Sequence, residues 1–138
     1  MNNYLIDTNC LISYTTTRSK NQTEKISEYI EDASNLKSEI IIISNIITEF
    51  VYTLQSVYKV DSRFISGMLV DVFKNPGIKY HHGYFINQIL TLWPVKIKDY
   101  GDAVLAAAAS ELKITVLTFD KPFSNQLSNT NIPHELIK

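Results

Sequence analysis

Asp7 and Asp120 each follow a short apolar run of the kind that forms a buried strand. The two runs are Tyr4-Leu5-Ile6 and Ile114–Phe119. In a parallel α/β sheet the ligand crevice lies at the carboxyl ends of the strands, so acids at those ends point toward a common site. Taken singly, Asp7 is also a good cap for a helix over Asn9–Tyr14, and Asp120 for a turn. Both interpretations stay open at this point.

Glu49 and Asp102 lie inside segments with a helical pattern. Glu49 belongs to Ile46–Val51, which is apolar on most of a helical surface, and a lone carboxylate there must be paired, protonated or bound to a cation. Asp102 shares a helical face with Leu105 and with alanines expected to dock on the sheet. The alternatives are that Glu49 pairs with a lysine on a solvated strip and that Asp102 only supports a helix start capped by Asp99.

Together these acids indicate a site for divalent cations. Carboxylate oxygens are hard ligands that suit Mg²⁺ or Mn²⁺, and magnesium keeps several waters, which leaves room for phosphate oxygens. In such a site one ion activates a water to attack phosphorus, and a second ion about 4 Å away stabilises the leaving oxygen. Hydrolysis of a phosphodiester then needs no nucleophilic side chain.

The bulk properties fit one soluble domain over residues 1–138. The chain has 138 residues, 45% hydrophobic and 20% charged, which is typical of a globular domain with one core. The formal net charge is −1, so any binding to nucleic acid must come from a local basic patch. Basic residues near expected loops or element ends are Arg18, Lys20, Lys59, Arg63, Lys96, Lys98 and Lys121.

Nothing in the sequence indicates a membrane segment. Three residues precede the first apolar run, and no stretch approaches the ~20 apolar residues that cross a bilayer, so we expect neither a signal peptide nor an anchor. The single cysteine, Cys10, cannot form an internal disulfide, which agrees with a reducing compartment. We therefore expect a cytoplasmic protein.

Short β-branched runs alternate with segments of helical period, which predicts an α/β fold with a central parallel sheet of four to five strands flanked by helices. The expected strands are Asn3–Asp7, Ile40–Ser44, Ile78–His81, Ile114–Phe119 and a weaker one near Ile132–Ile137. The expected helices are a short piece after Asp7, then Thr23–Leu36, Asn45–Tyr58, Ser62–Lys74, Gly83–Leu92 and Tyr100–Lys113. The polar stretch Thr15–Gln22 is expected to be one surface loop.

Four short motifs in this order resemble the PIN-domain nucleases, most closely the VapC-type toxins of toxin–antitoxin pairs. They are Asp7-Thr8-Asn9 after the first strand, Glu49 early in the helix after the second, the segment from Asp99 to Ala108, and the segment from Leu117 to Phe123. The resemblance spans nearly the whole chain. Each motif alone is weak, and the four in order are a fairly specific signal.

The resemblance implies a single PIN-like domain that acts as an Mg²⁺- or Mn²⁺-dependent endoribonuclease. It further implies the toxin of a type II toxin–antitoxin system, with an RNA substrate, a small antitoxin partner and a homodimeric state. By the same resemblance the metal-binding and catalytic acids are Asp7, Glu49, Asp102 and Asp120, and the supporting residues are Asn9, Asp99 and Thr118. The chain departs from the common pattern at Gly101, where alanine is usual, and at Lys113, where glycine often ends the helix.

Two other functions are weighed against this one. A non-catalytic α/β binding or scaffold protein would use its acids as caps and surface charges and would have no metal affinity. An aspartyl-nucleophile phosphatase would need a second acid two residues after Asp7, where this chain has Asn9. The general acid of that mechanism is therefore missing.

Overall fold

Five parallel strands form the central sheet. The computed structural model describes residues 1–138. The strands are β1 (Asn2–Ile6), β2 (Ser38–Ile43), β3 (Ile78–His81), β4 (Thr115–Thr118) and β5 (His134–Leu136). Their order in the sheet is β3-β2-β1-β4-β5, and every pairing is parallel. The expected parallel α/β architecture is confirmed.

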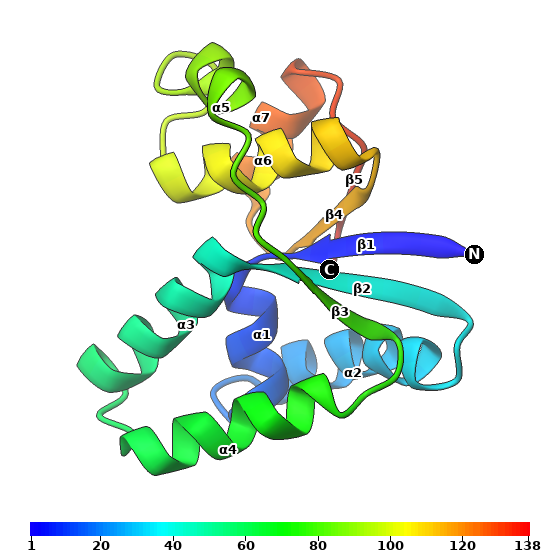
Figure 1. The fold of residues 1–138 in the computed structure, drawn as a ribbon, viewed down its shortest axis with the longest axis vertical. Helices are drawn as coiled ribbons and strands as arrows, with labels where there is room; N and C mark the ends of the chain where they lie inside the picture. Colours follow the sequence, from blue (N-terminus) through cyan, green and yellow to red (C-terminus); the bar gives the residue numbers. More distant parts are fainter.

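Seven helices cover the two faces of this sheet (Figure 1). They are α1 (Thr8–Thr15), α2 (Lys20–Ser34), α3 (Ser44–Ser56), α4 (Ser62–Phe73), α5 (Ile86–Leu92), α6 (Tyr100–Leu112) and α7 (Lys121–Asn129). In Figure 1, α1, α2 and α4 lie below the sheet, and α5, α6 and α7 lie above it. None of the helices combines the length and the apolar character needed to cross a membrane.

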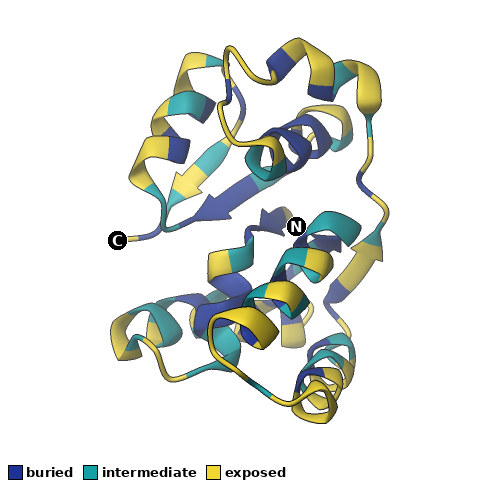
Figure 2. Cartoon of the chain, turned by 90° about the vertical axis from the view of Figure 1, so that its left-hand side faces the viewer, coloured by how far each residue is buried: buried dark blue, intermediate teal, exposed yellow.

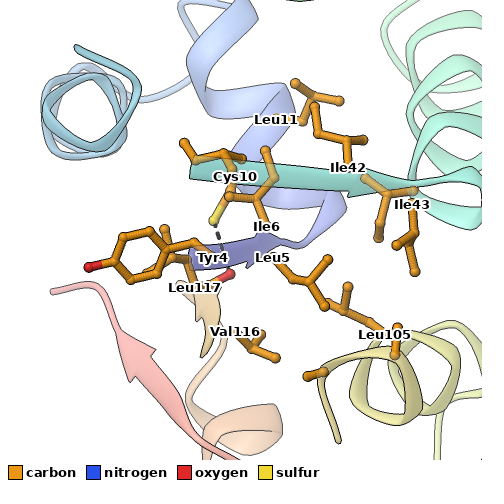
Figure 3. Close-up of a cluster of buried hydrophobic side chains, with 14 of the residues drawn as sticks. Tyr4, Leu5, Ile6, Cys10, Leu11, Ile42, Ile43, Leu105, Val116 and Leu117 are labelled. Carbon is orange, nitrogen blue, oxygen red and sulfur yellow. Dashed lines mark hydrogen bonds between the residues drawn. The ribbon is translucent and has the colours of Figure 1, made fainter. Parts of the chain in front are cut away.

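The core is built from both faces of the inner strands (Figures 2 and 3). Successive side chains of a strand point to opposite faces. Figure 3 shows Leu5 of β1 directed toward Leu105 of α6, while Ile6 is directed toward α1 and Cys10. The Cys10 thiol is fully buried and donates a hydrogen bond to the Leu117 carbonyl at 3.5 Å. Burial raises its pKa well above the usual value, so this cysteine is a packing residue.

Helix α6 is buried on nearly every side in its middle. All residues from Ala103 to Ala109 are buried, five of them alanines. Small side chains let a helix backbone approach the sheet closely while leaving few voids. Close docking of this helix also brings its first turn, which carries Asp102, to the edge of the sheet.

The carboxyl ends of β1 and β4 mark the point where the strand order reverses. From β1 the chain first builds β2 and β3 on one side, and later β4 and β5 on the other. Such a switch point leaves a crevice beyond the strand ends. Helix α3 runs along this edge and packs against both α1 and α6. The crevice is therefore bordered by β1, β4 and the first turns of several helices.

Two expectations about the polar segments were wrong. The stretch Thr15–Gln22 is not a single loop, because α1 continues through Thr15 and α2 begins at Lys20. The side chain of Ser19 caps α2 by accepting a hydrogen bond from the Gln22 backbone N–H. Helix α7 was not expected at all. Its sequence is mostly polar, but Asp120 caps it, Pro122 fits its first turn, and Phe123 and Leu127 anchor one face in the core.

The same substitution at two glycines should have opposite effects on stability. A Cβ at Gly77 would lie 2.1 Å from the Ala33 carbonyl oxygen, a backbone atom that cannot move aside cheaply, whereas a Cβ at Gly67 of α4 meets nothing within 4 Å. We expect Gly77→Ala to lower the free energy of unfolding by about 2 kcal/mol or more. Gly67→Ala should raise it by about 0.5–1 kcal/mol. Urea denaturation measures both, and equal effects would contradict the packing described here.

Candidate active site

All four acids singled out from the sequence line one pocket at the carboxyl edge of the sheet. The pocket has a volume of about 150 Å³. Its walls are formed by Asp7, Thr8, Asn9, Ile12, Ile46, Glu49, Thr53, Gly101, Asp102 and Asp120. The acids come from the end of β1, the second turn of α3, the first turn of α6 and the segment after β4. No basic side chain is among the walls.

Asp7 is buried and held through both carboxylate oxygens. Its Oδ1 accepts a hydrogen bond from the Cys10 backbone N–H at 2.9 Å and so caps α1. Its Oδ2 accepts from the Thr118 hydroxyl at 2.5 Å. Burial raises the pKa of Asp7, the two hydrogen bonds oppose that rise, and the charge of Asp120 adds to it. The carboxylate is fixed in place at an electrostatic cost.

Thr118 connects the two acids at the strand ends. The register of β1 and β4 pairs Ile6 with Leu117, so the residues that follow, Asp7 and Thr118, lie side by side. The Thr118 hydroxyl donates to Asp7 and accepts from the Asp120 backbone N–H at 3.0 Å. Asp120 in turn caps α7, because its Oδ1 accepts from the Phe123 N–H at 3.1 Å. One buried hydroxyl thus orients two elements of the site.

Glu49 is half-buried and has no lysine or arginine partner. Its Oε1 accepts from the Asn45 side-chain amide at 2.7 Å, one helical turn earlier, and its Oε2 lies 3.4 Å from the Thr8 hydroxyl, which donates to it. Burial and then the charge of Asp99 raise its pKa. The alternative in which Glu49 pairs with a lysine on a solvated strip is not what the structure contains, since the only ion pairs are Lys20–Glu24 and Lys74–Asp71.

Gly101 leaves the space into which the Glu49 carboxylate reaches. A Cβ at this position would lie 2.4 Å from Glu49 Oε1 and 3.2 Å from Asp99 Oδ2. An alanine here would therefore displace the flexible end of Glu49. Gly101, which stands where alanine is usual in the family that the motifs resemble, therefore makes room for the Glu49 carboxylate.

Asp99 caps α6 from outside the pocket, and Asp102 faces into it. Asp99 Oδ2 accepts from the Asp102 backbone N–H at 2.9 Å. The Asp102 carboxylate accepts no hydrogen bond from the chain. Burial, followed by the charges of Asp99 and Asp7, raises its pKa to about 7. Asp102 is therefore the acid of this pocket whose charge is least compensated by the protein.

The donor set suits a hard divalent cation, although it is not a ready-made cage. No group of three or more His, Cys, Asp or Glu side chains is already arranged to hold one ion. Magnesium in proteins binds through one or two carboxylates and retains several waters. Four carboxylates around a small pocket fit that mode of binding. Burial and neighbouring negative charges raise the pKa of three of them, Asp7, Glu49 and Asp102.

Several residues that shape the site were given no role in it from the sequence. Asn45 and Thr8 orient Glu49, and Arg18 donates to the side-chain and main-chain oxygens of Asn9 at 3.3 and 3.1 Å. Asn45 lies four residues before Glu49 in a helix, a spacing that could have revealed it. The contact of Arg18 depends on how the loop between α1 and α2 folds back, which no local pattern gives.

An aromatic pair lies beside the first turn of α6. The rings of Trp93 and Tyr100 meet edge to face, with centroids 5.2 Å apart. The Trp93 indole N–H donates to the Lys98 carbonyl at 3.1 Å. The segment that leads into Asp99 and Asp102 is therefore held by an aromatic contact and a hydrogen bond.

Removing the Asp102 charge should stabilise the metal-free protein at alkaline pH. A folded-state pKa of about 7, above the ordinary 3.8, means that the native state loses stability as pH rises between these values. We expect Asp102→Asn to raise the free energy of unfolding by about 2 kcal/mol at pH 8, a figure discounted for partial exposure, and to have little effect at pH 4. Urea denaturation in EDTA measures it. A gain of equal size at both pH values would contradict this account of Asp102.

No known family model matches the chain, and no curated protein matches its sequence. Solved structures do share its fold. One is a chain in the crystal structure of VapBC2 from Rickettsia felis bound to a DNA fragment from the VapBC2 promoter. Its TM-score is 0.71 at 16% identity, and the match covers 99% of both chains. For VapBC-1 from nontypeable Haemophilus influenzae the TM-score is 0.60 at 15% identity, covering 97% of both. For FitAB bound to an IR36 DNA fragment it is 0.62 at 12% identity, covering 96% of this chain and 94% of the other.

These likenesses extend over nearly the full length of each compared chain, so they concern the whole domain. They agree with the order of strands and helices described above and with the motifs that resemble VapC-type proteins. At such low identity they establish the architecture and nothing finer. The chain has a PIN-like fold.

Proposed function

We propose that this chain is an endoribonuclease dependent on Mg²⁺ or Mn²⁺ and the toxin of a type II toxin–antitoxin pair, acting in the cytoplasm. The observation that carries the proposal is that Asp7, Glu49, Asp102 and Asp120, from four separate segments, line one pocket of a PIN-like fold. A scaffold protein has no need to gather uncompensated carboxylates in this way. The RNA substrate is inferred from the motif resemblance.

The four carboxylates are the groups that would hold the cation. When bound, a divalent ion at such a site supplies an activated water for attack on phosphorus and stabilises the charge of the leaving oxygen. Asp7 is the most rigid of the four, being buried and hydrogen-bonded at both oxygens. Asp102 is the acid whose two oxygens are free for an external ligand, because its carboxylate accepts no hydrogen bond from the chain and lines the pocket.

Thr118, Asn45 and Asn9 have positioning roles in this proposal. Thr118 fixes one oxygen of Asp7 and the backbone of Asp120, and Asn45 fixes one oxygen of Glu49. Asn9 lines the pocket with its side-chain oxygen already engaged by Arg18. Such outer contacts keep carboxylates oriented when a cation is absent and reduce the reorganisation needed for binding.

Two exposed apolar surfaces support the protein partners in the proposal, an antitoxin and a second copy of the chain. The first lies on α3 and α4, where an apolar groove of about 460 Å³ is lined by Val51, Leu69, Phe73 and Val70, the last 53% exposed. The second lies on and after α5, where Leu90 and Val95 are 60% and 87% exposed. Surfaces of this kind are typical of protein interfaces. The likeness to chains of VapBC and FitAB structures supports the same proposal.

Deleting one charge of the pocket should abolish metal-dependent cleavage. We expect Asp7→Asn or Asp102→Asn to lower the rate of RNA cleavage in Mg²⁺ or Mn²⁺ by more than about a hundredfold, because each deletes a cation ligand at nearly constant shape. Cleavage of a labelled RNA by purified protein, with sequencing of the ends, measures this. The matched control is Asp32→Asn, an exposed acid on α2. Cleavage by either pocket variant at the wild-type rate would refute the assignment.

The cation should also stabilise the fold. We expect millimolar Mn²⁺ to raise the melting temperature by about 5 °C, since a ligand bound only by the native state stabilises it by mass action. EDTA should reverse the shift, and Glu49→Gln should reduce it while Asp32→Asn leaves it intact. The binding or scaffold alternative predicts no shift. A melting temperature unchanged by Mn²⁺ and Mg²⁺ would favour that alternative.

A further inference from the structure

Arg18 is held rigidly beside the acidic pocket. It lies in the loop between α1 and α2, and all its contacts are to neutral oxygens. Its Nε donates to the Ser13 hydroxyl at 3.0 Å, and its Nη1 donates to Asn9 Oδ1 at 3.3 Å. Its Nη2 donates to the Asn9 carbonyl at 3.1 Å and to Gln22 Oε1 at 3.3 Å. An exposed arginine is thus fixed in one orientation before any ligand arrives.

The charge of Arg18 is not neutralised by the protein. The ion pairs of the chain are Lys20–Glu24 and Lys74–Asp71, and neither includes Arg18. A guanidinium is always protonated, so its positive charge can attract a phosphate at any pH at which the protein is folded. Its hydrogen bonds within the chain use four of its five N–H groups, so one N–H on Nη1 and the positive charge remain for an external anion.

The cavity next to Arg18 adjoins the acidic pocket. It has a volume of about 360 Å³ and is lined by Asn9, Arg18, Ser19, Gln22, Phe119 and Asp120. Two of these walls, Asn9 and Asp120, also line the acidic pocket. Arg18 is the only basic residue that lines either cavity. Phe119 is half-buried there and offers an aromatic surface of the kind on which single-stranded bases stack.

Three other basic residues line different cavities. Lys96 and Lys113 line a separate cavity of about 660 Å³ at the far end of α6, and Arg63 lines another on α4. None of them is a wall of the acidic pocket or of the cavity beside Arg18. Arg18 is the one basic residue that lines these two cavities, and it supplies a local positive charge there in a chain of net charge −1.

We propose that Arg18 binds the phosphate of a nucleotide next to the one whose phosphodiester is cleaved, within the cavity shared with Asn9 and Asp120. The inference rests on the proposed nuclease function and adds a binding subsite for single-stranded RNA. Binding at this subsite would place the neighbouring phosphodiester over the carboxylates. The carboxylates alone repel the phosphates of the RNA backbone. The positive charge of Arg18 at the border of the pocket offsets part of that repulsion.

The test compares wild type, Arg18→Gln, Arg18→Lys and the control Lys20→Gln in cleavage of a short single-stranded RNA in Mn²⁺ at several salt concentrations. We expect Arg18→Gln to raise KM by about tenfold with little change in kcat. The slope of log(kcat/KM) against log[salt] should become shallower by about 0.7. Arg18→Lys should keep the slope and raise KM less, because it retains the charge but loses the hydrogen bonds that hold the charge beside Asn9. Lys20→Gln should behave as wild type.

The possible outcomes separate this inference from the function on which it rests. Wild-type cleavage with unchanged KM and salt slope in Arg18→Gln would overturn the role of Arg18 alone. A fall in melting temperature without a change in KM would show that Arg18 only ties the loop to α1, which also overturns it. If Arg18→Gln fails to fold, an unchanged KM in Arg18→Lys overturns the proposal and a raised KM supports it. No cleavage by wild type in Mn²⁺ or Mg²⁺ would overturn both.

Discussion

Mutual repulsion among four partly buried carboxylates is the constraint on which the rest of this structure depends. Burial and neighbouring negative charges raise the pKa of Asp7, Glu49 and Asp102, and none of the four acids forms an ion pair with a lysine or arginine. The rigid parts of the fold hold them together: an inner pair of parallel strands, a helix of alanines packed close to the sheet, and α3 along the carboxyl edge. Stability given up at a site of this kind is commonly a mark of function.

The same carboxylates serve local structure and the site together. Asp7 and Asp120 each cap a helix with one oxygen, as does Asp99 beside them. Strands end and helices begin at this edge, so capping acids are brought there by the fold itself, and the positive ends of the helix dipoles offset part of the negative charge. Capping a helix and lining the pocket do not exclude each other, because one oxygen of Asp7 and of Asp120 caps a helix while the same residue forms a wall of the pocket.

Regular elements with a clear apolar pattern could be predicted, and elements fixed by a few long-range contacts could not. Strand β3 spans the expected Ile78–His81, whereas α7 has only Phe123 and Leu127 as buried apolar anchors in a polar segment. The grouping of Asp7 with Asp120 follows from parallel strand ends. The reach of Glu49 past Gly101 and the folding back of Arg18 onto Asn9 depend on packing between distant segments, so no local spacing encodes them.

The chain has a single tryptophan, and its position gives the protein an internal optical probe. Trp93 contacts Tyr100 at the start of α6, two residues before Asp102. Indole emission responds to nearby charge and to the packing of its ring. The tryptophan fluorescence of this protein, excited apart from that of its eight tyrosines, originates next to the first turn of α6, so changes in that turn can be followed in the unlabelled chain.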